Sequence, residues 1–356
     1  MADGWRKNLI DLEPYVPGEQ RSVPGLVKLN TNENPYPPSP QVLYAVRNFD
    51  AASLRKYPNP TGEALRTAIG ARYGVSPDCV FVGNGSDEVL AFAFRAVFNG
   101  SLPVLFPDIT YSFYPVWCRF FGIPFETVPL DGDFRIAAYE YERPNGGIVL
   151  CNPNAPTGIG EGQEFVEYLL KTSPDSVVIV DEAYGDFGGW SAVGLTGTYE
   201  NLLVCRTLSK SYSLAGLRVG YLVGSREAIA AVTAVKDCVN SYTMSNLAVE
   251  AAIVALKDEA YFQANLERVL RTRYQTMNRL RALGFTVLDS QANFIFVSHP
   301  DAPAQALYEY LGARNILVRW FAGPRVRDFL RISIGMDADM ETLLAAIEAY
   351  LKEKTV

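Results

Sequence analysis

The feature that most constrains the fold is an alternation of short apolar runs with helix-like segments between residues 61 and 223. The runs are continuously apolar, as in parallel strands that are covered on both faces. Helices interleaved with such strands predict an α/β fold with a mostly parallel sheet and right-handed crossovers. The expected strands are residues 79–82, 102–106, 147–151, 176–180, 202–205 and 218–223, and the expected helices include residues 63–73 and 87–98.

The two ends of the chain depart from this pattern. The first forty residues are rich in Pro, Asn and Glu, which predicts an extended arm that packs on something else. Residues 247–283 are expected to form a long helical stretch, followed by strands at 285–288, 293–297 and 330–334 and a C-terminal helix. We therefore predict an arm with part of a small domain (1–45), a large α/β domain (46–255) and a small α+β domain (256–356).

Charge and residue counts exclude several classes of function. The chain has 32 Lys and Arg against 39 Asp and Glu, a net charge of −7, so nucleic acid is not expected as the main partner. The single histidine, His299, excludes a His-rich zinc site and is expected to be a plain surface residue. The five cysteines are widely spaced, which predicts neither disulfides nor a zinc site and fits a reducing cytoplasm. No apolar run is long enough to span a membrane, and the N-terminus lacks the apolar core of a signal peptide.

Ligands of open α/β sheets bind beyond the carboxyl ends of the strands, and small residues follow the first expected strand. In Gly83-Asn84-Gly85-Ser86-Asp87 they allow a tight turn into a helix N-terminus, which favours an anion such as phosphate. The same residues would also be expected in a strand–helix turn without a ligand, in which Ser86 or Asp87 caps the helix. The motif matches neither nucleotide-binding glycine fingerprint, so a nucleotide-binding protein gains little support.

A carboxylate and an amine follow two further expected strands. Asp181 ends an apolar strand, where it would be partly desolvated and would need a cationic partner, unless it only caps the next turn. Lys210 follows residues 202–205 among small hydroxyl residues, and a lysine near apolar walls can become a nucleophilic amine. By itself such a lysine would usually point to solvent. An amine, a desolvated carboxylate and a phosphate nest at neighbouring strand ends together match the needs of pyridoxal phosphate.

At these residues the chain resembles the fold type I pyridoxal-phosphate enzymes, specifically class I/II aminotransferases, and among them the histidinol-phosphate aminotransferases. The segment Ser209–Tyr221, with its Leu-Ala-Gly-Leu-Arg-x-Gly-Tyr ending, is highly specific for the superfamily. The matching signatures run through most of the chain: residues 29–35, 56–58, 85–88, 152–158, 181–184, 209–221 and 330–335.

The resemblance implies a role for each matching residue around the cofactor. Lys210 would join the cofactor aldehyde and later act as the base, and Asp181 would pair with the ring nitrogen. Tyr184 would hydrogen-bond the phenolate oxygen, and Tyr111 would stack on the ring. Tyr57 would reach the cofactor phosphate of a neighbouring subunit, which implies a homodimer. The other implied cofactor contacts are Gly85, Ser86, Asp87, Thr207, Ser209 and Arg218.

The resemblance also implies an anion-binding set for the substrate. Arg331 matches the arginine that binds the substrate's anionic group, and a mid-strand arginine would need a partner such as a bound anion. Arg319, with Tyr15 from the arm, matches an additional anion-binding pair, although Arg319 could equally be a surface residue. Asn32 is a further implied substrate contact. The tyrosines belong to a set of 20, most of which must serve packing or the surface.

The chain departs from the family pattern at one position. The family often has asparagine directly before Pro-Thr-Gly, where its amide meets the cofactor's phenolate oxygen. Here that position is Ala155, so either Asn154 takes over the contact or Tyr184 makes it with less help.

The activity that the resemblance implies is transfer of nitrogen between histidinol phosphate, the amino donor, and 2-oxoglutarate, a 2-oxo acid. An aromatic-amino-acid aminotransferase and a threonine-phosphate decarboxylase share the scaffold and remain open. A non-catalytic pyridoxal-phosphate-binding regulator would carry a DNA-binding segment ahead of this domain, and the arm is too short and not basic.

Overall fold

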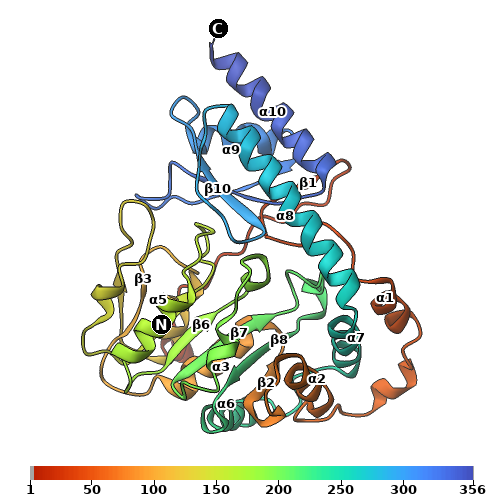
Figure 1. The fold of residues 1–356 in the computed structure, drawn as a ribbon, viewed down its shortest axis with the longest axis vertical. Coiled ribbons are helices and arrows are strands. Elements are labelled where there is room, and N and C mark those ends of the chain that lie inside the picture. The colour runs from red at the N-terminus through yellow and green to blue at the C-terminus, as the bar shows by residue number, and fades with distance from the viewer. Residues whose placement is uncertain (1–3, 356) are drawn as a thin grey trace.

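The computed structural model describes residues 4–355 and contains a seven-stranded sheet, a four-stranded sheet and a pair of two-residue strands (Figure 1). The large sheet has the order β2-β8-β7-β6-β5-β3-β4. The fold class is thus α/β with a mostly parallel central sheet, as the sequence predicts. Its strands are β2 (Val80–Gly83), β3 (Val104–Pro107), β4 (Phe125–Val128), β5 (Gly147–Cys151), β6 (Val178–Asp181), β7 (Leu202–Thr207) and β8 (Gly220–Gly224).

Two strands of this sheet differ from expectation. β8 lies between β2 and β7 and is antiparallel to both, although its apolar sequence was assigned to the parallel set. A continuous apolar run carries no information about strand direction, so the sequence pattern could not distinguish the two arrangements. β4 was not predicted, because Glu126 and Thr127 are exposed and interrupt the apolar pattern.

Helices cover both faces of the large sheet, as predicted. Neighbouring residues of one strand enter different cores: Val178 and Val180 pack on one face and Ile179 on the other. Helices α2, α5 and α7 contribute to the first face, and α3, α4 and α6 contribute to the second. Helices α1 to α7 are Pro40–Arg47, Glu63–Tyr73, Gly85–Val97, Phe113–Phe121, Gln163–Thr172, Arg226–Val239 and Asn246–Lys257.

The small sheet is antiparallel, has the order β12-β13-β10-β9, and packs with the last three helices (Figure 1). The helical stretch predicted as continuous over 247–283 is broken at Asp258, whose carboxylate caps the start of α8. The elements are α8 (Glu259–Ala282), β9 (Thr286–Val287), β10 (Phe294–Ser298), α9 (Ala304–Ala313), β11 (Ile316–Leu317), β12 (Arg319–Trp320), β13 (Leu330–Ser333) and α10 (Asp337–Thr355). No observation tests the predicted domain boundaries, which stay a prediction.

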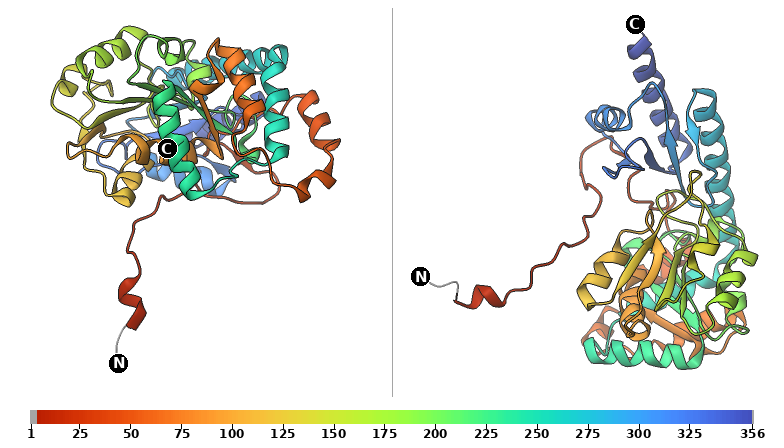
Figure 2. Two further views of the ribbon diagram at one scale, coloured as in Figure 1. Left: turned by 90° about the horizontal axis from the view of Figure 1, so that it is seen from below. Right: turned by 90° about the vertical axis from the view of Figure 1, so that its left-hand side faces the viewer.

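The N-terminal segment has two parts. The short 3₁₀ helix Gly4–Asn8 extends away from the body of the molecule (Figure 2). Further along, β1 (Val27–Lys28) pairs in parallel with β11, so the chain enters the body beside the small sheet. Residues 30–34 then cross from the small sheet toward the strand ends of the large one, where Asn34 donates to the carbonyl oxygens of Lys210 and Ser211.

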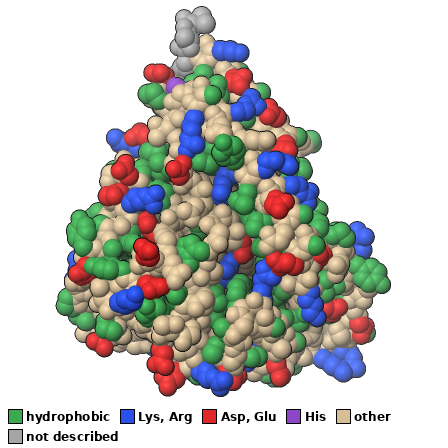
Figure 3. Space-filling view, viewed as in Figure 1, with side chains coloured by type: hydrophobic (Ala, Val, Ile, Leu, Met, Phe, Trp, Pro, Cys, Tyr) green, Lys and Arg blue, Asp and Glu red, His purple; other side chains and the backbone are tan. Residues whose placement is uncertain are grey.

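The surface and the helices add two observations. Acidic and basic side chains are interspersed on the face that Figure 3 shows. Within residues 4–355, no helix has the length and apolar character needed to cross a membrane, and no group of three His, Cys, Asp or Glu side chains is arranged to hold a metal ion.

Candidate active site

The carboxyl ends of the central strands open on a cavity of about 360 Å³, here called the strand-end cavity. A second cavity of about 360 Å³, the side cavity, adjoins it and shares Tyr15, Tyr111, Arg319 and Arg331. Most residues that the sequence singled out line the strand-end cavity: Tyr15, Asn32, Ser86, Asp87, Tyr111, Asp181, Tyr184, Thr207, Ser209, Lys210, Arg218, Arg319 and Arg331.

Lys210 reaches the cavity from the loop after β7. Its Nζ donates to the carbonyl oxygen of Thr31 (3.1 Å) and lies 5.8 Å from the ring centre of Tyr184. Burial, together with the nearby positive charge of Arg331, lowers the pKa of Lys210 to about 8. No carboxylate forms an ion pair with it in the part of the chain that the structure describes. An amine in this state is partly neutral near pH 7 and can act as a nucleophile or base.

Asp181 is the last residue of β6 and is almost fully buried. The Tyr114 hydroxyl donates to Oδ2 (2.9 Å), and the Ala183 N–H donates to Oδ1 (3.0 Å). Burial raises the pKa of Asp181 to about 6, although these two hydrogen bonds oppose the shift. Within residues 4–355 it has no cationic partner, so a buried carboxylate faces the cavity without the positive charge that it needs.

The start of α3 and the loop after β7 form one part of the cavity that can bind an anion. Gly85 opens α3 with φ +85°, and Asn84 makes no side-chain cap, so the first N–H groups of the helix are free to bind an anion. The hydroxyls of Thr207 and Ser209 lie 2.9 Å apart beside it. Arg218 Nη2 contacts the Asp87 carboxylate (3.1 Å), and both residues are substantially exposed.

Close backbone packing shapes this end of the cavity. A Cβ on Gly220 would lie 2.4 Å from the carbonyl carbon of Gly85, which only glycine avoids. A Cβ on Gly85 would lie 2.5 Å from Arg218 Nη2. Gly85 itself does not line the cavity, so it shapes the loop through its backbone.

Two arginines stand side by side at the other end of the cavity. Arg319 and Arg331 are opposite each other on β12 and β13. Arg331 Nη2 donates to the Asn30 carbonyl oxygen (3.0 Å), but its buried Nε has no hydrogen-bond partner among residues 4–355. Arg319 donates to the carbonyl oxygens of Val16 and Pro17 in the arm. Two guanidinium groups without a carboxylate partner form a site for an anion.

Three tyrosines complete the walls. Tyr111 lines the cavity, and its hydroxyl donates to the Asp87 carboxylate (2.8 Å). Tyr15 from the arm stacks on Phe113 with ring centres 4.4 Å apart. The Tyr184 hydroxyl accepts a hydrogen bond from Asn32 Nδ2 (2.9 Å). Asn32, which was expected to contact substrate, thus lines the cavity, and its Nδ2 donates a hydrogen bond to Tyr184.

Two side chains that were predicted to contact the cofactor, those of Asn154 and Tyr57, do not line either cavity. Asn154 does not line either cavity, because its amide donates to Ile109 O and Thr157 Oγ1 and accepts from the Thr110 hydroxyl. Of the two alternatives left open at Ala155, these contacts favour the one in which Tyr184 makes the contact with less help. Tyr57 is 81% exposed and stacks on Tyr242 away from the cavity. His299 is partly buried: its Nε2 contacts the Leu283 carbonyl oxygen at the end of α8, and its Nδ1 accepts from the Asp301 N–H.

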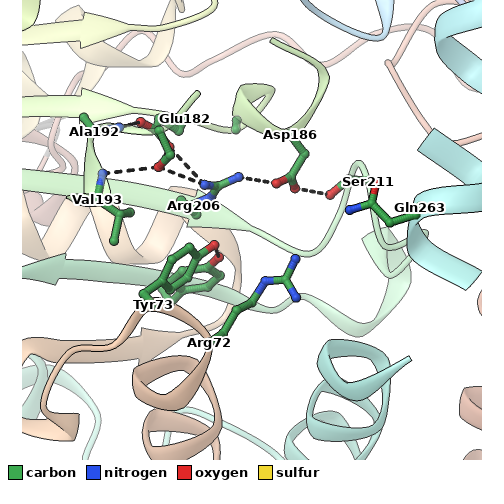
Figure 4. Close-up of polar contacts among 12 residues, drawn as sticks. Arg72, Tyr73, Glu182, Asp186, Ala192, Val193, Arg206, Ser211 and Gln263 are labelled. Atoms are coloured by element: carbon green, nitrogen blue, oxygen red, sulfur yellow. Dashed lines mark hydrogen bonds and ion pairs between the residues drawn. The ribbon is translucent and has the colours of Figure 1, made fainter. Parts of the chain in front are cut away.

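A buried network on the other side of the same strand ends was missed by sequence analysis (Figure 4). Arg206 of β7 lies between Glu182 (3.1 Å) and Asp186, and Ser211 donates to Asp186 beyond it. Ser191 Oγ and Ala192 N–H donate to Glu182, each at 2.6 Å. Because neighbours along a strand point in opposite directions, Asp181 faces the cavity while Glu182 faces this network. An arginine within an apolar strand was the signal that could have revealed it.

Tyr114 was also missed, since nothing in its aromatic-rich segment distinguished it from Tyr111. It is fully buried on α4, and its hydroxyl reaches Asp181 at the end of β6. Burial and the adjacent Asp181 carboxylate raise the pKa of Tyr114, so its hydroxyl is protonated and donates.

The residues fit the pyridoxal phosphate that the sequence predicts. The cavity volume is within the range of small-ligand sites, about 300–1,000 Å³. Among the described residues, Asp181 has no cationic partner, the start of α3 has no side-chain cap, and the Arg331 Nε has no acceptor. These groups match a ring nitrogen, a phosphate and an anionic substrate. These groups are the donor set that such a cofactor and its substrate require.

Comparison with known proteins gives one consistent result. The family model "Aminotransferase class I and II" matches residues 24–347. A histidinol-phosphate aminotransferase 2 of Dechloromonas aromatica is 51% identical over 351 residues, 98% of this chain and 99% of the relative. Histidinol-phosphate aminotransferase 1 of Pseudomonas aeruginosa is 51% identical over 352 residues, 99% of this chain and 100% of the relative.

A solved structure extends the comparison to three dimensions. The histidinol-phosphate aminotransferase from Sinorhizobium meliloti in complex with pyridoxal-5'-phosphate superimposes with a TM-score of 0.82. It is 27% identical and covers 92% of this chain and 91% of its own. The sequence signatures, the strand-end cavity and these matches agree, and the chain belongs to the class I and II aminotransferase family.

Proposed function

We propose that the protein is a pyridoxal-phosphate-dependent aminotransferase that exchanges nitrogen between histidinol phosphate and 2-oxoglutarate. The observation that carries the proposal is that Lys210, Asp181 and the Arg319–Arg331 pair open on one cavity. Support for the substrate comes from relatives of this name that are 51% identical over nearly the whole chain.

Cofactor binding follows from the unpaired groups. Bound pyridoxal phosphate supplies an electron sink for the substrate carbon that carries the amino group. In the proposal, Asp181 keeps the ring nitrogen protonated, and the Tyr114 hydroxyl holds the Asp181 carboxylate in place. Ser86, Ser209 and the N–H groups at the start of α3 bind the phosphate, for which Arg218 would exchange its exposed contact with Asp87.

Lys210 has the binding and proton-transfer role. Its pKa of about 8 leaves part of the amine neutral at pH 7, as attachment to the cofactor aldehyde requires. Once released, Nζ removes the proton from the substrate carbon that carries the amino group and returns a proton later in the cycle. The Thr31 carbonyl oxygen, 3.1 Å away, orients the amine without neutralising a charge.

The arginine pair and the side cavity hold the substrate. Arg331 and Arg319 bind the phosphate of histidinol phosphate, and Tyr15 closes this end from the arm. The walls of the side cavity include Ile109, Phe321 and Val326, which suit a flat side chain such as imidazole. The same arginines bind a carboxylate of 2-oxoglutarate in the second half-reaction.

A homodimer in the cytoplasm is part of the proposal. Tyr57 is 81% exposed and does not line the cavity of its own subunit, as expected if it completes the cofactor site of a second subunit. Exposed apolar side chains in the extended arm, Trp5 and Ile10, would also be covered by a partner. Five free cysteines support a reducing compartment. Light scattering should give twice the chain mass, and Tyr57→Phe should weaken cofactor retention.

The test of the reaction compares substrates in the purified holoenzyme. The value of kcat/KM for histidinol phosphate should exceed that for phenylalanine by orders of magnitude, because two guanidinium groups match its dianionic phosphate better than the singly charged carboxylate of phenylalanine. Arg331→Gln should lower kcat/KM for histidinol phosphate about 10- to 100-fold, the loss of charge-assisted hydrogen bonds. Arg279→Gln, which breaks exposed ion pairs on α8, is the matched control.

Other outcomes would redirect the assignment. Equal kcat/KM values for phenylalanine and histidinol phosphate would favour an aromatic-amino-acid aminotransferase. Release of carbon dioxide from phosphothreonine would favour a decarboxylase. A protein that gains no visible absorbance with pyridoxal phosphate would contradict the proposal as a whole.

A further inference from the structure

A buried chain of hydrogen bonds links the small sheet to Tyr184 through Asn32. The Asn32 backbone N–H donates to Ser333 Oγ (2.8 Å), and the Ser333 hydroxyl donates to Asn32 Oδ1 (2.9 Å). Asn293 Nδ2 donates to the Asn32 carbonyl oxygen (3.0 Å). Asn32, Ser333 and Asn293 are each at most 2% exposed, so water does not compete for these bonds.

This arrangement fixes the orientation of the Asn32 amide. The oxygen and nitrogen of an asparagine side chain are told apart by their partners. Here the Ser333 proton goes to Oδ1, which leaves Nδ2 to face Tyr184. Asn32 has φ +56°, a left-handed conformation that asparagine tolerates better than most residues, so the backbone also holds the side chain in this position.

The consequence for Tyr184 is a defined direction of its own proton. The hydroxyl oxygen accepts from Asn32 Nδ2, so its proton must point away from Asn32. No acceptor for that proton is present in residues 4–355, and Tyr184 lines the strand-end cavity. Burial raises the pKa of Tyr184, so the proton is retained at neutral pH.

We infer that Asn32 is a positioning residue that keeps the Tyr184 hydroxyl a hydrogen-bond donor into the cavity, toward an oxyanion of the bound cofactor. The inference rests on the proposed function, since the phenolate oxygen of pyridoxal phosphate is that oxyanion. Asn32 then acts through Tyr184 and need not touch substrate. The role matters in this chain because Ala155 has no side-chain amide, and the side-chain amide of Asn154 is hydrogen-bonded elsewhere.

The test is the visible absorbance of the holoenzyme as a function of pH. The phenolate oxygen carries most negative charge after the cofactor–lysine linkage loses its proton, so a donor beside it favours that state. Tyr184→Phe should therefore raise the pH midpoint by about one unit, the value of one hydrogen bond to a charged group. Asn32→Gly keeps the left-handed backbone, removes the amide, and should raise the midpoint by about half as much.

A double-mutant cycle separates positioning from general support. With Phe at position 184, Asn32→Gly should leave the midpoint where Tyr184→Phe alone puts it, because Asn32 acts through the hydroxyl. Ser333→Ala should shift the midpoint in the same direction as Asn32→Gly by releasing the amide. Asn201→Ala, which removes a partly buried asparagine far from the cavity, should leave it unchanged.

Two results would overturn the inference. One is a wild-type midpoint in Asn32→Gly when the variant binds the cofactor fully. The other is an Asn32→Gly shift that adds in full to the shift of Tyr184→Phe. Failure of the proposed function would differ from both, because the wild-type protein itself would then show no cofactor absorbance.

Discussion

Two groups of charged residues lie at the carboxyl ends of β6 and β7, on opposite faces of the sheet, and they differ in whether the protein supplies their partners. On the cavity side, Asp181 is buried, Lys210 is partly buried, and neither has an ion-pair partner within residues 4–355. On the other side, Glu182, Arg206 and Asp186 are paired and hydrogen-bonded to one another (Figure 4). The neighbouring residues Asp181 and Glu182 thus differ: the Asp181 carboxylate is free to pair with a ligand, and the Glu182 carboxylate is already paired within the protein.

The difference shows how buried charged residues that bind a ligand can be distinguished from buried charged residues that stabilise the fold. Burial raises the pKa of Asp181 and of Glu182 alike, so burial alone does not distinguish them. The distinction is whether the protein supplies the opposite charge. A buried charge without a partner is costly to the fold, and the cost is compensated when a ligand supplies the partner. Four predictions test this reading, from the largest expected effect to the smallest.

The largest effect is expected at Lys210. Lys210→Ala should lower kcat/KM by at least about 10⁴-fold, because the base and the attachment point are lost together. It should not lower the thermal midpoint of the apoprotein, since no ion pair is broken. Lys236 is the matched control: it is buried but donates to Pro60 O and Ser241 O and pairs with Asp237. Lys236→Met should lower the midpoint, and activity per folded molecule should persist.

The next effect is expected at Asp181. Asp181→Asn should lower kcat by about 10²–10³-fold, as for loss of one preorganised electrostatic group in an active site. The apoprotein should be at least as stable as wild type, because an unpaired carboxylate has been removed. Steady-state kinetics and urea unfolding measure the two quantities. A variant that unfolds readily would place Asp181 with the structural charges and break the comparison.

The reverse pattern is expected at Glu182. Glu182→Gln leaves Arg206 with Asp186 alone and should cost about 3 kcal/mol of unfolding free energy, the lower end for a broken buried pair. The value of kcat should stay within a few-fold of wild type once the protein is folded and loaded. Urea unfolding gives the first quantity. If activity fell as far as in Asp181→Asn with little loss of stability, the paired side would belong to the chemistry.

The smallest effect is a pH dependence of apoprotein stability. Asp181 binds a proton more readily in the folded state, with a pKa of about 6 against 3.8, so its contribution to stability falls as pH rises through that window. Lys210 has a folded pKa of about 8 against 10.5, so its contribution rises with pH between those values. Thermal midpoints should therefore lose the first slope in Asp181→Asn and the second in Lys210→Ala. Unchanged slopes would contradict the pKa shifts.

Much of the fold and the cavity wall could be predicted because the decisive signals are local. Continuous apolar runs mark buried strands, and polar residues at their ends mark one edge of the sheet, which is how Asp181 and Lys210 were found. The predicted parallel direction of β8 was wrong, because an apolar run does not indicate the direction of a strand. Roles of the individual site residues remain predictions.

What escaped prediction depends on partners far away in sequence. Tyr114 resembles other tyrosines until the fold brings α4 against Asp181. The position of Asn32 depends on Ser333, and that of Asn154 on Thr110, through hydrogen bonds that no local pattern encodes. Arg206 follows the strand predicted at 202–205, and only the fold shows that it continues β7 and lies between Glu182 and Asp186.

The parallel pairing of β1 with β11 bears on how the molecule is made. Val27 and Lys28 leave the ribosome early, but their partners Ile316 and Leu317 are translated near the end. The large sheet can therefore assemble while the leading segment still waits for its place, and the wall that Asn32 contributes is among the last parts to be completed. A nascent chain that stalls before residue 316 would carry the amine and the carboxylate but not the wall that closes over them.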